Sequence, residues 1–187
     1  MQTTTTLTAR SLSKDIALVL IASFLIALSG ALFIPLWFTP VPLGFRNLVV
    51  LLTGALLGPK RGSAAVFAFL LQGAMGLPVF LSGHIGVPYM LGPNGGYLLG
   101  YLIAAYVVGA MVERRGKSPL RLMEAMLIGI VLIQLCGVAY LSTFVGLSKA
   151  FLLGSAPFLL GDLLKAIFGA RLLSKFLGKS LKSEEIS

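Results

Sequence analysis

The chain has 187 residues, of which 57% are hydrophobic and 11% are charged. This composition excludes an ordinary soluble domain and indicates an all-α integral membrane protein. The formal net charge of +9 is compatible with nucleic acid. However, basic residues in membrane proteins mostly flank helices on the cytoplasmic side, so we expect a lipid bilayer and no nucleic acid as partner.

Six transmembrane helices are predicted in a single transmembrane domain, residues 1–187, with polar tails at 1–13 and 178–187. A span needs about 20 apolar residues, with some tolerance. The expected helices are Lys14–Ile34, Phe45–Leu57, 63–76, Gly95–Glu113, Pro119–Phe144 and Pro157–Phe176. The prolines of Pro35–Gly44 predict an interfacial loop that carries Trp37 and Phe38. Gly58–Gly62 is predicted to be a tight basic turn, and Gly146–Ser155 a connector.

The first predicted helix carries a stripe of small residues. Ser23, Ala27 and Ala31 recur every four residues and therefore share one helix face. In lipid, such a stripe lets another helix approach closely. The stripe predicts either packing inside this chain or docking of a partner subunit, and the sequence favours neither.

The segment Leu77–Tyr101 is rich in glycine and proline and holds the single histidine, His84. A segment of this composition cannot form one regular helix, although both of its flanks are apolar. Irregular backbone beside lipid must satisfy its polar groups on protein or water. The segment is either a plain extracytoplasmic connector or the lining of a site. We favour the second, because glycine allows close approach to a ligand.

The basic residues predict the topology. With six spans, all but three of the 15 basic residues fall on one side, near the termini or in the turns at 58–62 and 113–121. Positive residues concentrate on the cytoplasmic side, so both termini are expected there. The sequence thus predicts a multi-pass protein of the plasma membrane with both termini cytoplasmic.

The three remaining basic residues, Arg46, Lys149 and Lys165, map to the outer half of the protein. Asp162 lies there too, three residues before Lys165, and this spacing puts both side chains on one helix face. Ionisable residues within a span are costly and predict function by default. The alternative is a structural Asp–Lys pair. Because His84 and Asn94 map to the same end, we favour a binding site.

The sequence contains no catalytic set, no metal-ligand spacing and no phosphate-binding loop. We therefore expect no enzyme activity, no metal and no cofactor. A pocket that combines cations, an acid, amides and aromatic side chains suits a small amphipathic anion. A membrane enzyme or a self-sufficient carrier is the alternative, but no activated nucleophile or clear inverted repeat supports it.

Five motifs resemble the BioY family, the biotin-binding S components of energy-coupling factor (ECF) vitamin transporters. In order, they read LVLIASFLIALSG, FTPVPLGFRNLVVLLTGALLGPKRG, GLPVF, LGPNGGYLLGY and PFLLGDLLKA. The resemblance covers about residues 15–175 and implies six membrane helices and high-affinity biotin binding at the extracytoplasmic face. It also implies biotin uptake with a transmembrane coupling subunit and two ABC-type ATPases, or without them. An S component for another vitamin would differ only in the pocket.

The residues predicted to bind biotin are Asp162, Lys165, His84, Arg46, Asn94 and Tyr97. Of these, the resemblance implies Asp162, Lys165 and His84. Asp162 is expected to accept from the ureido ring and Lys165 to bind the carboxylate, with Arg46 or Lys149 as alternative carboxylate partners. Ser23, Ala27 and Ala31 would lie where S components dock on the coupling subunit. The chain has Asn94 where the family usually has Thr, and Arg46 where it usually has Gln.

Overall fold

The computed structural model describes residues 3–31, 33–34, 43–80 and 83–184. Its elements are α1 (Thr3–Ser29), β1 (Phe33–Ile34), β2 (Leu43–Gly44), α2 (Arg46–Ala74), α3 (Gly86–Met90), α4 (Gly95–Arg115), α5 (Pro119–Val145), α6 (Leu147–Gly154), η2 (Ala156–Phe158) and α7 (Leu159–Glu184). The two short strands pair antiparallel, with Phe33 opposite Gly44. Trp37 and Phe38, expected in an interfacial loop, lie outside the described residues.

The continuous helix α2 is interrupted at Gly58, whose φ of 78° and ψ of 177° are not helical. This conformation is open almost only to glycine. Pro59 follows and suits the first position of a new helix. Residues 46–57 and 59–74 therefore form two helices that meet at the predicted basic turn. Together with α1, α4, α5 and α7 they make the six predicted membrane segments.

Four of these segments are long and apolar enough to cross a membrane as single helices. They are Leu12–Ser29, Gly95–Arg115, Pro119–Val145 and Leu147–Lys175, the last of which combines α6 and α7. The two halves of α2 fall short of the roughly 20 residues that a full span requires. Lys60 and Arg61 at the turn between them make α2 as a whole less apolar.

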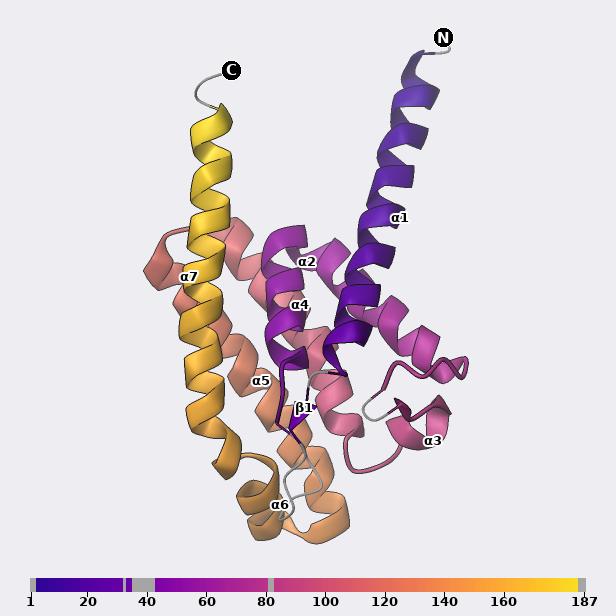
Figure 1. Cartoon of the computed structure of the whole chain (residues 1–187), viewed down its shortest axis with the longest axis vertical. Helices are drawn as coiled ribbons and strands as arrows, with labels where there is room; N and C mark the ends of the chain where they lie inside the picture. Colours follow the sequence, from indigo (N-terminus) through magenta and orange to yellow (C-terminus); the bar gives the residue numbers. More distant parts are fainter. Residues whose placement is uncertain (1–2, 32, 35–42, 81–82, 185–187) are drawn as a thin grey trace.

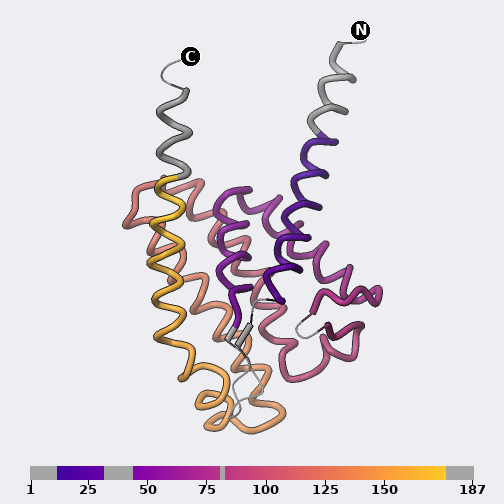
Figure 2. The backbone as a smooth tube through the Cα atoms, in the orientation of Figure 1, coloured from indigo at the N-terminus to yellow at the C-terminus, as the bar shows by residue number. Residues whose placement is uncertain are grey.

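The two ends of the bundle differ in structure (Figure 1). α1 begins and α7 ends at the same end, which we call the terminal end. The Gly58 turn lies toward the same end, because Arg61, just after it, pairs with Asp15 of α1. The end of α4 lies beside this turn, because Gly58 contacts Glu113. At the opposite end, the loop end, lie β1, α3 and α6, and Figure 2 shows the chain passing there from α5 through α6 into α7.

The core forms where the helices meet around α2. α2 packs against α1 and α4, α4 against α5, and α7 against both α5 and α2. Fully buried apolar side chains fill the centre, including Val50, Leu51, Phe69, Val108 and Ile133. Large apolar side chains on the outer helix faces are exposed, among them Leu20, Phe24, Val131, Leu135, Leu160 and Leu164. Exposed apolar faces on this scale are typical of a protein that lies in lipid.

Several predicted boundaries were wrong. α1 ends at Ser29 rather than Ile34, and Phe33 and Ile34 form β1. Gly30, just after α1, lies against the guanidinium of Arg46, which leaves no room there for a Cβ atom. The polar segment 1–13, predicted to be a frayed tail or a short surface helix, includes the start of α1 at Thr3, and α7 continues to Glu184. The expected connector at 146–155 contains the helix α6.

Candidate functional site

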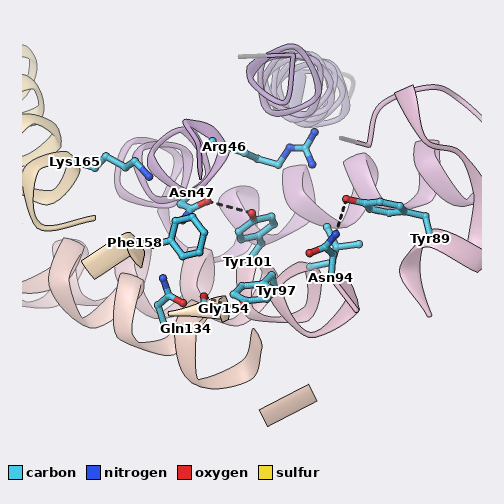
Figure 3. Close-up of a pocket in the computed structure, with 12 residues that line it drawn as sticks. Arg46, Asn47, Tyr89, Asn94, Tyr97, Tyr101, Gln134, Gly154, Phe158 and Lys165 are labelled. Atoms are coloured by element: carbon cyan, nitrogen blue, oxygen red, sulfur yellow. Dashed lines mark hydrogen bonds between the residues drawn. The ribbon is translucent and has the colours of Figure 1, made fainter. Parts of the chain in front are cut away.

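A pocket opens at the loop end, where the start of α2, the start of α4, and α5, α6 and α7 converge (Figure 3). The empty space between its walls, with the open solvent at its mouth included, is about 580 Å³. The lining combines cations, amides and aromatic rings: Gly44, Arg46, Asn47, Tyr89, Asn94, Tyr97, Leu98, Tyr101, Gln134, Gly154, Phe158 and Lys165. Most of the lining side chains carry a polar atom.

Arg46, the first residue of α2, is a buried cation in this lining, with 4% of its surface exposed. Its guanidinium donates to the carbonyl oxygen of Val79 at 2.9 Å and lies 5.1 Å from the centre of the Phe69 ring. Its Nε atom is buried, and no described residue forms a hydrogen bond with it. No carboxylate forms an ion pair with Arg46 within the described ranges. The positive charge of Arg46 therefore lies in the pocket wall without an acidic partner among the described residues.

Lys165, on the first turns of α7, is a cation of a different kind. Its Nζ donates to Oδ1 of Asp162 at 2.9 Å, and the exposed fractions of the two side chains are 10% and 2%. The other carboxylate oxygen, Oδ2, accepts from Nε2 of Gln134 on α5 at 2.7 Å. Both oxygens of Asp162 are thus engaged, and the charge of Lys165 is already balanced.

Two tyrosines of α4 connect the pocket to its neighbouring elements. The hydroxyl of Tyr97 donates to the carbonyl oxygen of Gly154, at the end of α6, at 2.7 Å. The hydroxyl of Tyr101 donates to Oδ1 of Asn47 on α2 at 3.2 Å (Figure 3). Both rings are buried, so each hydroxyl needs a partner. These bonds fix α6 and the start of α2 against α4, and the rings form part of the pocket wall.

The segment between α2 and α4 closes another side of the pocket. Nδ2 of Asn94 donates to the hydroxyl of Tyr89 at 3.3 Å (Figure 3). The Tyr89 ring stacks on Phe80 with 5.0 Å between the ring centres. His84 packs on the other residues of this segment, 5.2 Å from the Tyr89 ring, and is exposed. The glycine- and proline-rich segment is therefore partly ordered by stacked aromatic rings.

Four predicted binding residues, Arg46, Asn94, Tyr97 and Lys165, meet in the lining of one pocket. Asp162 lies directly behind them, 1% exposed and bonded to Lys165 and Gln134. His84 is absent from the lining, and its ring packs against that of Tyr89, which does line the pocket. Lys149 is exposed on α6, also outside the lining.

Sequence reasoning did not select five other polar or aromatic residues of the lining: Asn47, Tyr89, Tyr101, Gln134 and Phe158. Gln134 carried the clearest signal, because a glutamine inside a long apolar helix needs a polar partner. Tyr101 closes the LGPNGGYLLGY motif, and Asn47 follows Arg46 directly. Their convergence depends on how the helices pack, which the sequence does not specify.

The three residues of the small-residue stripe do not share one exposed surface. Ser23 is fully buried, and its hydroxyl accepts from Nε2 of Gln72 on α2 at 2.9 Å. Ala27 is partly buried against the core, and Ala31 is exposed beyond the end of α1. At Ser23 the stripe therefore packs within the chain, which was one of the two predicted alternatives.

The chemistry of this pocket is that of binding. Nowhere in the described residues do three or more His, Cys, Asp or Glu side chains gather to hold a metal ion. The pocket offers one uncompensated cation, one neutralised acid–base pair, an amide carbonyl and aromatic walls. This arrangement suits a small molecule with an anionic end, a polar end and an apolar middle.

A family model and individual relatives all match this chain to the same family. The model of the BioY family matches residues 1–181. The Biotin transporter BioY of Rhizobium etli is 38% identical over 171 residues, covering 86% of this chain and 91% of the relative. The Biotin transporter BioY of Thermotoga maritima is 36% identical over 132 residues, which cover 70% of this chain and 78% of the relative.

A solved structure also matches. The crystal structure of the S-component for biotin from an ECF-type ABC transporter superposes with a TM-score of 0.81. The identity is 28%, and the match covers 90% of this chain and 93% of that structure. At this similarity the two chains share the whole membrane fold.

Proposed function

The chain belongs to the BioY family, and we propose that it is a biotin transporter that binds biotin in the pocket at the loop end. The relatives named biotin transporters cover most of this chain, and the matching crystal structure is that of a biotin S-component. On this basis the protein is a transport subunit and not an enzyme. It is a multi-pass membrane protein, as its apolar helices indicate.

More specifically, we propose that the chain is an S component that binds biotin with high affinity and works with an ECF module or alone. That module would supply a transmembrane coupling subunit and two ABC-type ATPases. The pocket would face the outside of the cell and the termini the cytoplasm. The distribution of basic residues supports this orientation, since positive side chains concentrate on the cytoplasmic side.

Arg46 is the observation that carries the proposal of an anionic ligand. A cation that is 4% exposed and has no acidic partner in the described part of the chain is costly in a membrane protein. An anionic ligand in the pocket would compensate that charge. The carboxylate of biotin fits this role, and a guanidinium can bind a carboxylate with two hydrogen bonds.

This assignment favours Arg46 over Lys165 as the partner of the carboxylate. Lys165 is already paired with Asp162 at 2.9 Å, so a second carboxylate there would compete with the first. The Asp162–Lys165–Gln134 cluster instead offers hydrogen-bonding groups of both kinds to the ureido ring. Tyr97, Tyr101 and Phe158 would enclose the apolar middle of the ligand.

The test compares biotin with its uncharged amide by titration calorimetry. Arg46→Met should weaken biotin by 2–5 kcal/mol, about 30-fold or more, because the carboxylate loses its cation. The amide should lose much less, and Arg46→Lys should recover part of the affinity for biotin. Lys149→Gln, which removes an exposed cation at the same end, is the matched control and should change neither affinity.

Equal losses for biotin and the amide in Arg46→Met would show that Arg46 supports the pocket without binding the carboxylate. Lys165→Met would then be the informative variant. If Lys165→Met lost affinity for biotin but not for the amide, Lys165 would be the residue that binds the carboxylate.

A further inference from the structure

Gln134 is a buried amide in the middle of α5, at the wall of the pocket below Phe158 (Figure 3). Its exposed fraction is 9%, and it belongs to a helix whose other buried residues are apolar or glycine. A buried amide in such a helix costs free energy unless its donor and its acceptor both find partners. Among the residues that the structure describes, only the donor has a partner.

The orientation of this amide follows from its neighbour. An ionised carboxylate can only accept hydrogen bonds, so the group that faces Asp162 must be the NH₂ group of Gln134. That nitrogen lies 2.7 Å from Oδ2 of Asp162. The carbonyl oxygen, Oε1, must then point elsewhere, and it is buried with no hydrogen-bond partner among the described residues.

Asp162 cannot present its own acceptors as freely. It is 1% exposed, is absent from the pocket lining, and uses both oxygens for Lys165 and Gln134. Gln134 and Lys165, by contrast, both line the pocket. The cluster therefore places one ammonium donor and one unpaired, buried carbonyl acceptor at the pocket wall, both on residues held by the carboxylate behind them.

From this geometry we infer that Oε1 of Gln134 accepts a hydrogen bond from an N–H group of the ligand and selects ligands that carry one. This inference rests on the proposed function, in which the ligand is biotin and the donor is a ureido N–H. Lys165 then faces the ureido carbonyl, and Asp162 acts as a positioning residue for both contacts.

The test uses carbamate analogues of biotin, in which oxygen replaces one ureido N–H without adding bulk. Wild-type protein should bind biotin at least about tenfold more tightly than one of the two analogues, because a buried acceptor is left unpaired. Gln134→Met should lose about tenfold in affinity for biotin. It should also bind biotin and that analogue almost equally. Gln134→Leu serves as a second variant, so that the result does not depend on one replacement.

Gln72→Met is the matched control, because it removes a partly buried glutamine bonded to Ser23 outside the pocket. It should leave both affinities unchanged. Unchanged biotin affinity in Gln134→Met would overturn the inference, as would undiminished discrimination against the analogue. If wild-type protein binds neither biotin nor its analogues, the proposed function itself fails. If it binds biotin and Gln134 has no effect, only the present inference fails.

Discussion

At the scale of single residues, the two cations of the pocket differ in what surrounds them. Lys165 has a carboxylate at 2.9 Å, whereas Arg46 has a backbone carbonyl and an aromatic face but no ion pair within the part of the chain described. Buried charges are tolerated when they are paired. The unpaired Arg46 is therefore better suited to an anionic ligand, and Lys165 belongs to a preformed polar cluster.

Asp162 is expected to matter for any ligand that uses the ring end of the pocket. Asp162→Asn removes the charge that balances Lys165 and disturbs the orientation of Gln134. Leaving a buried ammonium unpaired costs roughly 2–5 kcal/mol, so biotin and biotin amide should both weaken by about 30-fold or more. Titration calorimetry with the two ligands measures this, and a loss confined to biotin would contradict the assignment.

Much of the site could be predicted from the types of residue and their end of the bundle. An ionisable residue inside a span is rare enough to indicate function, and this argument selected Arg46, Asp162 and Lys165. His84 was selected because it maps to the same end of the bundle and because the family resemblance implies a polar contact there, and it lies outside the lining. Whether a charge is paired with its neighbour depends on side-chain distances that a sequence does not contain.

At the scale of helices, apolar length and glycine–proline signals predicted six membrane segments and the break at Gly58. The boundaries near the pocket were predicted less well. α1 ends earlier than predicted, and the residue that follows it, Gly30, lies against the guanidinium of Arg46. The sequence does not reveal this tertiary contact. α6 is a short helix held to α4 by the bond from Tyr97 to Gly154, so its order depends on tertiary contact.

Two substitutions in and after α1 distinguish packing of this segment within the chain from docking of the coupling subunit. Ser23→Val should destabilise the protein by about 1–3 kcal/mol, because Gln72 loses its buried acceptor. Ala31→Trp should leave stability and biotin binding intact, because Ala31 is exposed. If Ala31 docks the coupling subunit, its bulk should abolish complex formation. Thermal unfolding and co-purification measure the two effects, and a complex that survives Ala31→Trp would argue against docking at this position.

At the scale of the whole molecule, the loop end, whose elements line the pocket, lies opposite the end where α1 begins and α7 ends (Figure 1). The loop end holds the pocket, and the terminal end holds the Gly58 turn, where Arg61 pairs with Asp15 of α1 at 2.9 Å. If the basic terminal end lies in the cytoplasm, as we propose, the pocket would open to the outside, as uptake requires. The apolar outer faces of α1, α5 and α7 would contact lipid between these two ends.

This orientation can be measured with single cysteines in a Cys136→Ala background. Lys149→Cys, on α6 at the loop end, should react with an impermeant thiol reagent in intact cells. Lys117→Cys, between α4 and α5, should react only after the membrane is opened. The opposite pattern would place the pocket in the cytoplasm and would contradict uptake from outside.

The central claim is that this chain binds biotin in the pocket between Arg46 and the Asp162–Lys165–Gln134 cluster. Native mass spectrometry of the purified protein, after addition of biotin, tests it most directly. Wild-type protein and Lys149→Gln should each retain one biotin, whereas Arg46→Met and Asp162→Asn should retain little or none. A wild-type protein that retains no biotin, or retains it equally in all four forms, would contradict the claim.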